Sequence, residues 1–258
     1  MLLLSHPQML SVTLNFCGVI AATFGPAIVL SAYIIAKRPV LIILSVFAAF
    51  LWLCSITVVA TSWWLLVPLR NFMWLLLLYA VAVQELCRWG TYALFERFMR
   101  GLQSAGLLSA ASPRATPALS VPAACASGLG VGVMQALVTY GDVLVGARQP
   151  GTFYTPYCSG FSVFAVDALS ACAFIVLNVL LSVVGWAAAY PRASCPMCIS
   201  IVGLHYAASG STLMQSAPIM PLGEGCALAL PSLAGVVATA GVVAGVVVAN
   251  SAWKLGEA

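Results

Sequence analysis

The sequence contains very few charged residues: ten Lys and Arg and six Asp and Glu, together 6% of 258 residues. A soluble domain carries about a quarter charged residues, so this chain cannot cover a surface that faces water. The net charge of +4 at pH 7 is spread over many short segments. This scarcity excludes an ordinary soluble domain, and the scattered cations argue against a nucleic-acid-binding face.

Three other common features are missing. No basic segment precedes the first apolar run, which continues to about Ala36, so we expect a retained first span rather than a cleaved signal peptide. The nine cysteines are spread along the chain, mostly inside apolar runs, and predict no disulfide framework. The CxxC pair of Cys195 and Cys198 has no second pair or nearby histidine ligands, so we expect neither a metal site nor a cofactor.

Long apolar runs make up most of the chain. A transmembrane helix needs about 20 mostly apolar residues, and seven runs reach this length or come close to it. They predict an all-α, polytopic bundle of seven transmembrane helices that forms one membrane domain over residues 1–258. The expected helices cover residues 12–36, 40–67, 72–95, 119–145, 161–189, 197–215 and 228–250.

The cations between these runs predict an orientation. If the N-terminus is lumenal or extracellular and the C-terminus cytosolic, the cytosolic segments hold seven cations and the outer segments two, as the positive-inside rule requires. The cytosolic set is Lys37, Arg38, Arg97, Arg100, Arg114, Arg192 and Lys254, and the outer set is Arg70 and Arg148. An even number of spans would lose this agreement.

Two connections are rich in turn-forming residues. The stretch 101–121, with several serines and two prolines, is predicted to be a mobile cytosolic loop. The stretch 146–159 is predicted to be an outer loop. Neither resembles a folded domain.

Small residues recur at four-residue intervals in the fourth run. Gly128, Gly132 and Ala136 fall on one helix face, whereas Gly130 falls on another. Membrane helices associate through close backbone contact at such small-residue faces. We therefore predict a helix-packing and assembly face at Gly128, Gly132 and Ala136.

A few polar residues fall at membrane depth, where they are costly and mark functional or structural ties. Gln84, Glu85 and Arg88 cluster in the third run, and the spacing of Glu85 and Arg88 permits an ion pair within one helix. Asn178 in the fifth run and His205 in the sixth are expected to form hydrogen bonds between helices.

Two other classes of membrane protein are alternatives: a transporter or channel, and an intramembrane protease. A transporter or channel would use Glu85, Arg88, His205 and Asn178 to line a polar path. An intramembrane protease would need two facing aspartates or a serine with a histidine. The available aspartates, Asp142 and Asp167, lie near the outer ends of their helices and not at mid-depth. A serine protease of this kind needs its histidine after the serine, whereas His205 comes before the nearby serines.

The whole chain resembles the anterior-pharynx-defective (Aph) family of gamma-secretase subunits, as a divergent member. The similar segments keep the family's order: 24–27 (FGPA), 38–39 (RP) with 41–44 (LIIL), 50–55 (FLWLCS), Gln84-Glu85-x-x-Arg88 with Tyr92 and 101–102 (GL), 128–136, and Val202-Gly203-x-His205 with 209–210 (SG). The family generally has histidines in both the fifth and sixth spans. Here the sixth-span position is His205, whereas Asn178 occupies the fifth-span position.

This resemblance implies a non-catalytic scaffold in gamma-secretase, which cleaves type I membrane proteins such as Notch-like receptors. The implied partners are presenilin, which would carry the catalytic aspartates, nicastrin and the presenilin enhancer. The implied location is the endoplasmic reticulum, the Golgi and the plasma or endosomal membrane. Asparagine at position 178 keeps a donor and an acceptor but cannot titrate, which favours a hydrogen-bonding role there.

Overall fold

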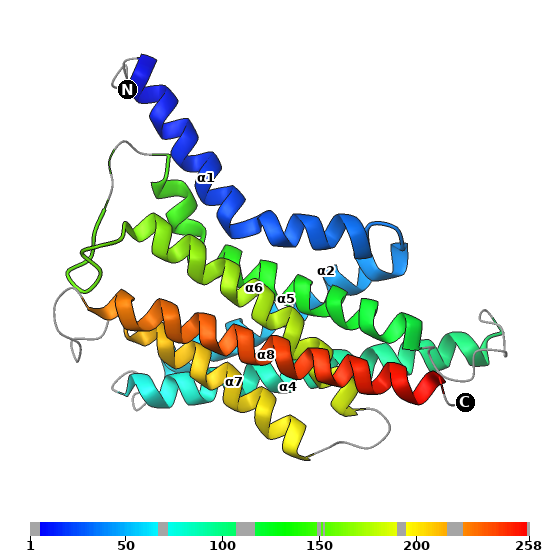
Figure 1. Ribbon diagram of the computed structural model, residues 1–258. Helices are drawn as coiled ribbons and strands as arrows, with labels where there is room; N and C mark the ends of the chain where they lie inside the picture. Colours follow the sequence, from blue (N-terminus) through cyan, green and yellow to red (C-terminus); the bar gives the residue numbers. More distant parts are fainter. Residues whose placement is uncertain are drawn as a thin grey trace.

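The structure, a computed structural model, describes residues 6–66, 72–106, 117–148, 151, 153–189, 195–215 and 224–256. Within these ranges the chain is helical, with no strand (Figure 1). The elements are α1 (His6–Leu30), η1 (Ser31–Ile35), α2 (Pro39–Leu65), α4 (Met73–Ser104), α5 (Pro117–Gly146), α6 (Val163–Ala189), α7 (Cys195–Leu213) and α8 (Gly225–Gly256).

The predicted all-α bundle of seven helices is confirmed, since each apolar run forms one helix, and η1 continues α1 as a short π-helix. Among the described residues, five helices are long and apolar enough to cross a membrane: α1 with η1, α2, α5, α6 and α8. The other two, α4 and α7, carry Glu85, Arg88 and His205. Polar groups make these two helices less apolar.

The centre of the bundle is formed by α5 and α6. In the most apolar stretch of each helix, 67% of the residues in α5 and 72% of those in α6 are buried, compared with 22–28% in α1, α2 and α8. Helices α5 and α6 pack most extensively on each other, α2 covers α5, and α8 and α1 cover α6. Helix α7 bridges α8, α6 and α4. The outer helices therefore present apolar side chains outward, as a lipid-facing bundle requires.

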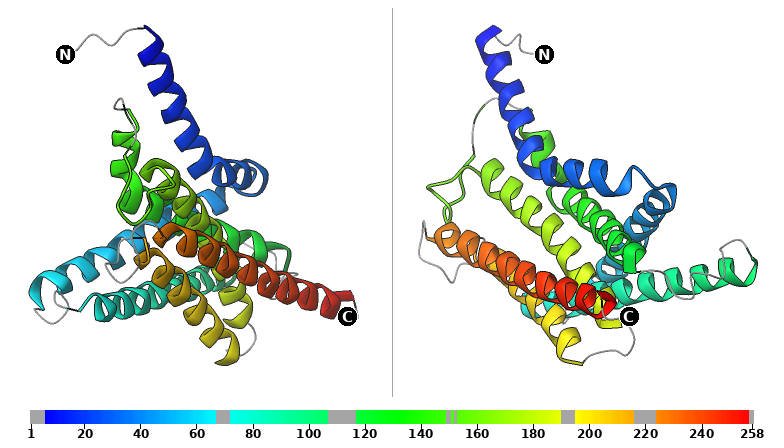
Figure 2. Two further views of the ribbon diagram at one scale, coloured as in Figure 1. Left: turned by 60° about the vertical axis from the view of Figure 1, so that its left-hand side comes forward. Right: turned by 45° about the vertical axis from the view of Figure 1, so that its right-hand side comes forward.

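Helix α1 bends in the middle, so that its first half stands away from the other helices (Figures 1 and 2). Pro26 lies inside this helix. A proline has no N–H to donate to the carbonyl four residues earlier, and its ring crowds that carbonyl, which is the usual cause of such a bend.

The prediction that 101–121 is a loop is wrong at both of its ends. Residues 101–104 extend α4, and 117–121 begin α5, while 107–116 lie outside the described residues. The last turns of α4 project past the neighbouring helices (Figure 2). Charged residues such as Arg97 mark where a helix leaves lipid, but they favour helix as much as leucine does, so the helix continues into water.

Candidate functional site

Four helices bring polar side chains together in the interior. The members are Glu85 and Arg88 from α4, Gln135 from α5, Asn178 and Ser182 from α6, and His205 from α7, and each is at most 9% exposed. We call these six residues the polar cluster. A buried polar group that lacks a partner costs several kcal/mol, so this cluster is tolerated in the interior only if its members bond to each other.

Arg88 uses all of its hydrogen-bonding capacity. Its Nε and Nη2 donate to Glu85 Oε2 at 3.1 Å and Oε1 at 3.3 Å, forming the predicted ion pair. Nη1 donates to the Asn178 carbonyl at 3.1 Å and to Ser182 Oγ at 2.7 Å, and Nη2 also donates to Asn178 Oδ1 at 2.8 Å. A guanidinium has five N–H donors, and here there are five bonds. Arg88 therefore fastens α4 to α6.

Glu85 carries the network across to α7. Its Oε1 also bonds His205 Nδ1, so one carboxylate binds both the guanidinium and the imidazole. A carboxylate held by a guanidinium can only accept, and Nδ1 is therefore the protonated nitrogen that donates. The predicted tie at His205 is thus present, and it joins α7 to α4.

Asn178 is the link to α5. Its Nδ2 donates to Gln135 Oε1 at 2.8 Å and to the Phe174 carbonyl of its own helix at 2.9 Å. The side-chain oxygen must face Arg88, because a guanidinium has no acceptor to offer an amide N–H. The asparagine thus uses both kinds of hydrogen bond, donating to Gln135 and accepting from Arg88.

Gln84 was predicted to belong with Glu85 and Arg88, but its side chain points to a different neighbour. Gln84 Oε1 accepts from Trp52 Nε1 of α2 at 3.4 Å. Adjacent residues on a helix are separated by about 100°, so Gln84 joins α4 to α2 while Glu85 faces the interior. Gln135 and Ser182 are not among the residues predicted from the sequence. The available signals were an isolated glutamine in an apolar run and the four-residue spacing of Asn178 and Ser182.

The small-residue face of α5 lets α6 approach closely, so that Asn178 of α6 can bond Gln135 of α5. A Cβ added at Gly128 would lie 2.5 Å from the Asn178 carbonyl oxygen, and one at Gly132 would lie 2.8 Å from Ile175 Cα. Ala136, the third member, is 1% exposed and lies on the wall of a small hollow that α1 also lines. These residues thus pack inside this chain, against α6 and beside α1. Their predicted role in assembly with other subunits remains a prediction, and it would act through the fold of this bundle.

Gly130 points to another helix, as its position in the sequence predicted. A Cβ there would overlap the backbone carbonyl of Ser45 in α2. Helix α5 is therefore held closely on two sides, by α6 and by α2.

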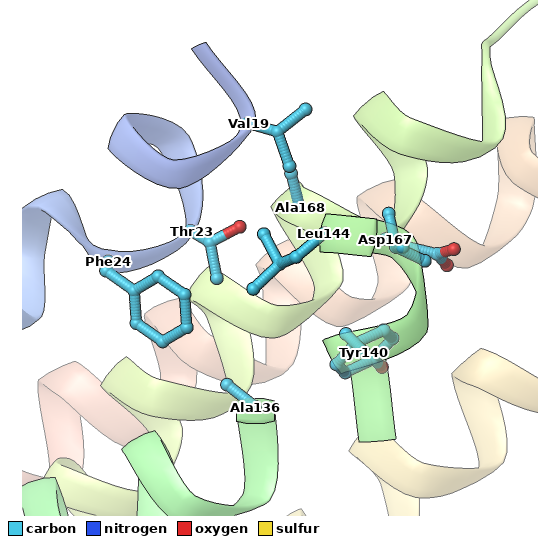
Figure 3. A pocket seen from close by; sticks show the side chains of 9 residues that line it. Val19, Thr23, Phe24, Ala136, Tyr140, Leu144, Asp167 and Ala168 are labelled. Atoms are coloured by element: carbon cyan, nitrogen blue, oxygen red, sulfur yellow. The ribbon is translucent and has the colours of Figure 1, made fainter. Parts of the chain in front are cut away.

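The two aspartates considered for catalysis lie at one end of the bundle, away from the polar cluster. Asp142 is exposed and accepts the Val143 N–H at 2.9 Å, within its own helix. Asp167 is half-buried in the wall of the hollow beneath α1, beside Tyr140 (Figure 3). This hollow is lined mainly by apolar side chains from α1, α5 and α6.

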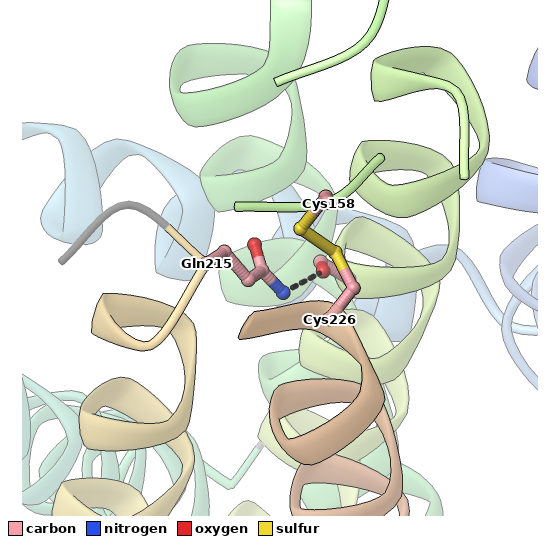
Figure 4. Close-up of a disulfide and its surroundings, with 4 residues drawn as sticks. Cys158, Gln215 and Cys226 are labelled. Carbon is pink, nitrogen blue, oxygen red and sulfur yellow. Dashed lines mark hydrogen bonds between the residues drawn. A yellow bond between two sulfur atoms is a disulfide. The ribbon is translucent and has the colours of Figure 1, made fainter. Parts of the chain in front are cut away.

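One prediction about the cysteines is wrong. Cys158 and Cys226 form a disulfide, with Cα atoms 5.1 Å apart, between the segment before α6 and the start of α8 (Figure 4). The Gly225 N–H donates to the Tyr157 carbonyl at 2.9 Å, and Gln215 Nε2 donates to Ser170 Oγ at 3.1 Å nearby. The two cysteines are 68 residues apart, one in the segment before α6 and the other in the first turn of α8. Only the packing of α8 on α6 brings them together.

Comparison with known proteins agrees with this architecture. The family model described as "Aph-1 protein" matches residues 14–251. Gamma-secretase subunit APH1-like of Arabidopsis thaliana is 28% identical over 221 residues, which cover 84% of this chain and 85% of the relative. Gamma-secretase subunit Aph-1 of Drosophila melanogaster is 31% identical over 171 residues (66% and 68%), and APH-1B of Mus musculus is 30% identical over 146 residues (53% and 54%). The seven-helix chain, with its buried polar cluster, therefore belongs to the Aph-1 family.

Proposed function

We propose that this chain is the non-catalytic assembly subunit of a gamma-secretase, an intramembrane protease complex. Family membership over residues 14–251 supports the proposal, as do relatives that are named as gamma-secretase subunits. The chain would form one membrane domain and would stabilise presenilin and nicastrin, together with the presenilin enhancer. The catalytic aspartates would belong to presenilin, and the substrates would be type I membrane proteins such as Notch-like receptors.

The single observation that favours a scaffold over a catalyst or a carrier is the bonding of the polar cluster. Every donor of Arg88 is taken, and the Glu85 carboxylate binds both Arg88 and His205. Side chains that are buried and bonded to each other are committed to one another, and they fix the relative positions of α4, α5, α6 and α7. The transporter alternative, in which these side chains line a path, has no support in this arrangement.

The proposed location is an internal membrane system and the cell surface: the endoplasmic reticulum, the Golgi and the plasma or endosomal membrane. The proposed orientation places the start of α1 in the lumen and the end of α8 in the cytosol, and the two lie at opposite ends of the bundle (Figure 1). The disulfide supports this orientation independently of the cations. Cys158 precedes α6 and Cys226 lies in the first turn of α8, both at the end of the bundle that the charge pattern places outside, and disulfides persist in the oxidising lumen. Of the cations in that pattern, Arg70, Arg114 and Arg192 lie outside the described residues, as does the side chain of Lys254.

Purification of the tagged chain in mild detergent, with mass spectrometry of what accompanies it, tests the proposed function. A presenilin-like diaspartyl protein and a nicastrin-like protein with a large ectodomain are the expected companions. The chain alone, in detergent that preserves membrane complexes, would contradict the proposal. The Gly128→Leu, Gly132→Leu double variant should lose both companions while still inserting, and Gly245→Leu is the control because a Cβ there meets nothing within 4 Å. Intact complexes from the double variant would contradict an assembly role for this face.

The orientation has a separate test. An N-glycosylation acceptor inserted beside Tyr154 should receive a glycan, whereas the same insertion beside Ala105 should not. The reverse pattern would overturn the proposed orientation and leave the assembly proposal untouched.

A further inference from the structure

A hollow of about 290 Å³ lies between the start of α2 and the end of α4. Its lining includes Lys37, Arg38, Val40, Leu41, Met99 and Leu102. We propose that this hollow binds one anionic phospholipid, with the phosphate at Lys37 and Arg38 and the first part of an acyl chain against Val40, Met99 and Leu102. The inference rests on the proposed orientation but not on the proposed assembly role.

The positive charges of Lys37 and Arg38 are available to an anionic ligand. Both side chains are exposed, and no carboxylate of the described residues forms a salt bridge with either of them. Lys37 Nζ lies 6.0 Å from the centroid of the Tyr33 ring. On the neighbouring end of α4, the carboxylate of Glu96 is engaged by Arg100 at 3.5 Å. The positive charge at the hollow is therefore uncompensated in this part of the chain.

The remaining wall is apolar. Leu41 is fully buried, whereas Met99 and Leu102 are only partly covered. A small soluble anion would use the cations and leave this wall unused. A phospholipid matches both parts, because its headgroup is anionic and its chain is hydrocarbon. The volume approaches the lower limit of ligand pockets, about 300 Å³, and suits a headgroup with the first part of one chain.

The position in the membrane agrees with such an occupant. The turn between η1 and α2 lies where the chain leaves lipid, on the side that the proposed orientation places in the cytosol. Anionic lipids are concentrated in the cytoplasmic leaflet, and basic pockets between transmembrane helices on this side bind their headgroups. The start of α2 also directs the positive end of its helix dipole at the hollow.

The test uses the full-length chain, purified in neutral detergent and studied by native mass spectrometry. Phosphatidylserine and phosphatidylcholine with the same acyl chains are added in equal amounts. One bound phosphatidylserine is expected, with a preference of about tenfold over phosphatidylcholine. Equal retention of the two lipids would overturn the proposal. Full displacement by equimolar soluble glycerophosphoserine would also overturn it, because the site would then recognise a free anion.

Two variants locate the site. Lys37→Gln with Arg38→Gln should weaken phosphatidylserine binding by roughly thirtyfold, because each basic residue contributes about a fivefold factor near an anionic headgroup. The matched control, Arg97→Gln with Arg100→Gln, removes the same charge from the same end but outside the lining, and should change binding by at most about threefold. Equal losses in the two double variants would mean diffuse surface charge and would refute the site.

Met99→Trp provides a second measurement that leaves the charge unchanged. The larger side chain should fill the hollow and reduce phosphatidylserine binding by about tenfold. Undiminished binding by this variant would show that the lipid sits elsewhere. Elution volume and helix content identify variants that retain the fold, and either variant alone can contradict the proposal.

Discussion

Replacing Glu85 by glutamine is predicted to destabilise the bundle strongly. The carboxylate is the counter-ion of Arg88, and the two side chains are 4% and 5% exposed. Glutamine keeps the shape but removes the charge, which leaves a buried guanidinium without compensation. Breaking a buried ion pair by removing one partner costs about 3–5 kcal/mol. For a chain of this size that loss corresponds to a fall in melting temperature of roughly 10 °C.

The same helix provides the matched control. Glu96 and Arg100 also form an ion pair within one helix, at 3.5 Å, but their side chains are 50% and 65% exposed. Exposed pairs at this spacing contribute only about 0.3–0.5 kcal/mol. Glu96→Gln should therefore lower the melting temperature by no more than about 2 °C.

The assay is thermal unfolding of the purified chain in neutral detergent, followed by fluorescence-detected size exclusion. A third variant, Glu85→Gln with Arg88→Met, removes both charges and should be less destabilised than the sum of the single variants, because no unpaired charge remains. Equal melting temperatures for Glu85→Gln and Glu96→Gln would refute the electrostatic reasoning. Strict additivity in the double variant would refute the coupling.

Three further predictions follow from the packing. Gly128→Leu with Gly132→Leu should lower the melting temperature of the isolated chain by more than Gly245→Leu, because only the first two side chains would collide with the backbone of α6; equal effects would show that α5 can move away. Cys158→Ser should remove the mobility shift between reduced and non-reduced protein on a gel and cost about 2–5 kcal/mol of stability, and an unchanged gel shift would show that this disulfide does not form. Asn178→Leu should cost about 2–3 kcal/mol, because it leaves a donor of Arg88 and the Gln135 oxygen without partners, and a melting temperature unchanged from the parent chain would contradict this role.

Much of the architecture was predictable because lipid imposes a simple rule. A backbone in hydrocarbon must bond to itself, so every long apolar run becomes a helix, and the count of seven follows from the runs. The ion pair of Glu85 and Arg88 was predictable for a similar local reason, since residues three apart lie on one helix face. The C-terminal end of α4 was not predictable, because apolarity reports where a helix leaves lipid and not where its hydrogen bonds stop.

The sequence by itself determined which residues span the membrane and which polar side chains are forced to find partners inside it. Only the tertiary structure decided what those partners are. Arg88 bonds Asn178 and Ser182 some 90 positions away, Glu85 bonds His205 at a separation of 120, and Cys158 bonds Cys226 at a separation of 68. Such pairings depend on which helices are neighbours and how closely they approach. That approach is set by surface shape at positions such as Gly128, where the absence of a Cβ lets α6 come near enough for the polar cluster to form.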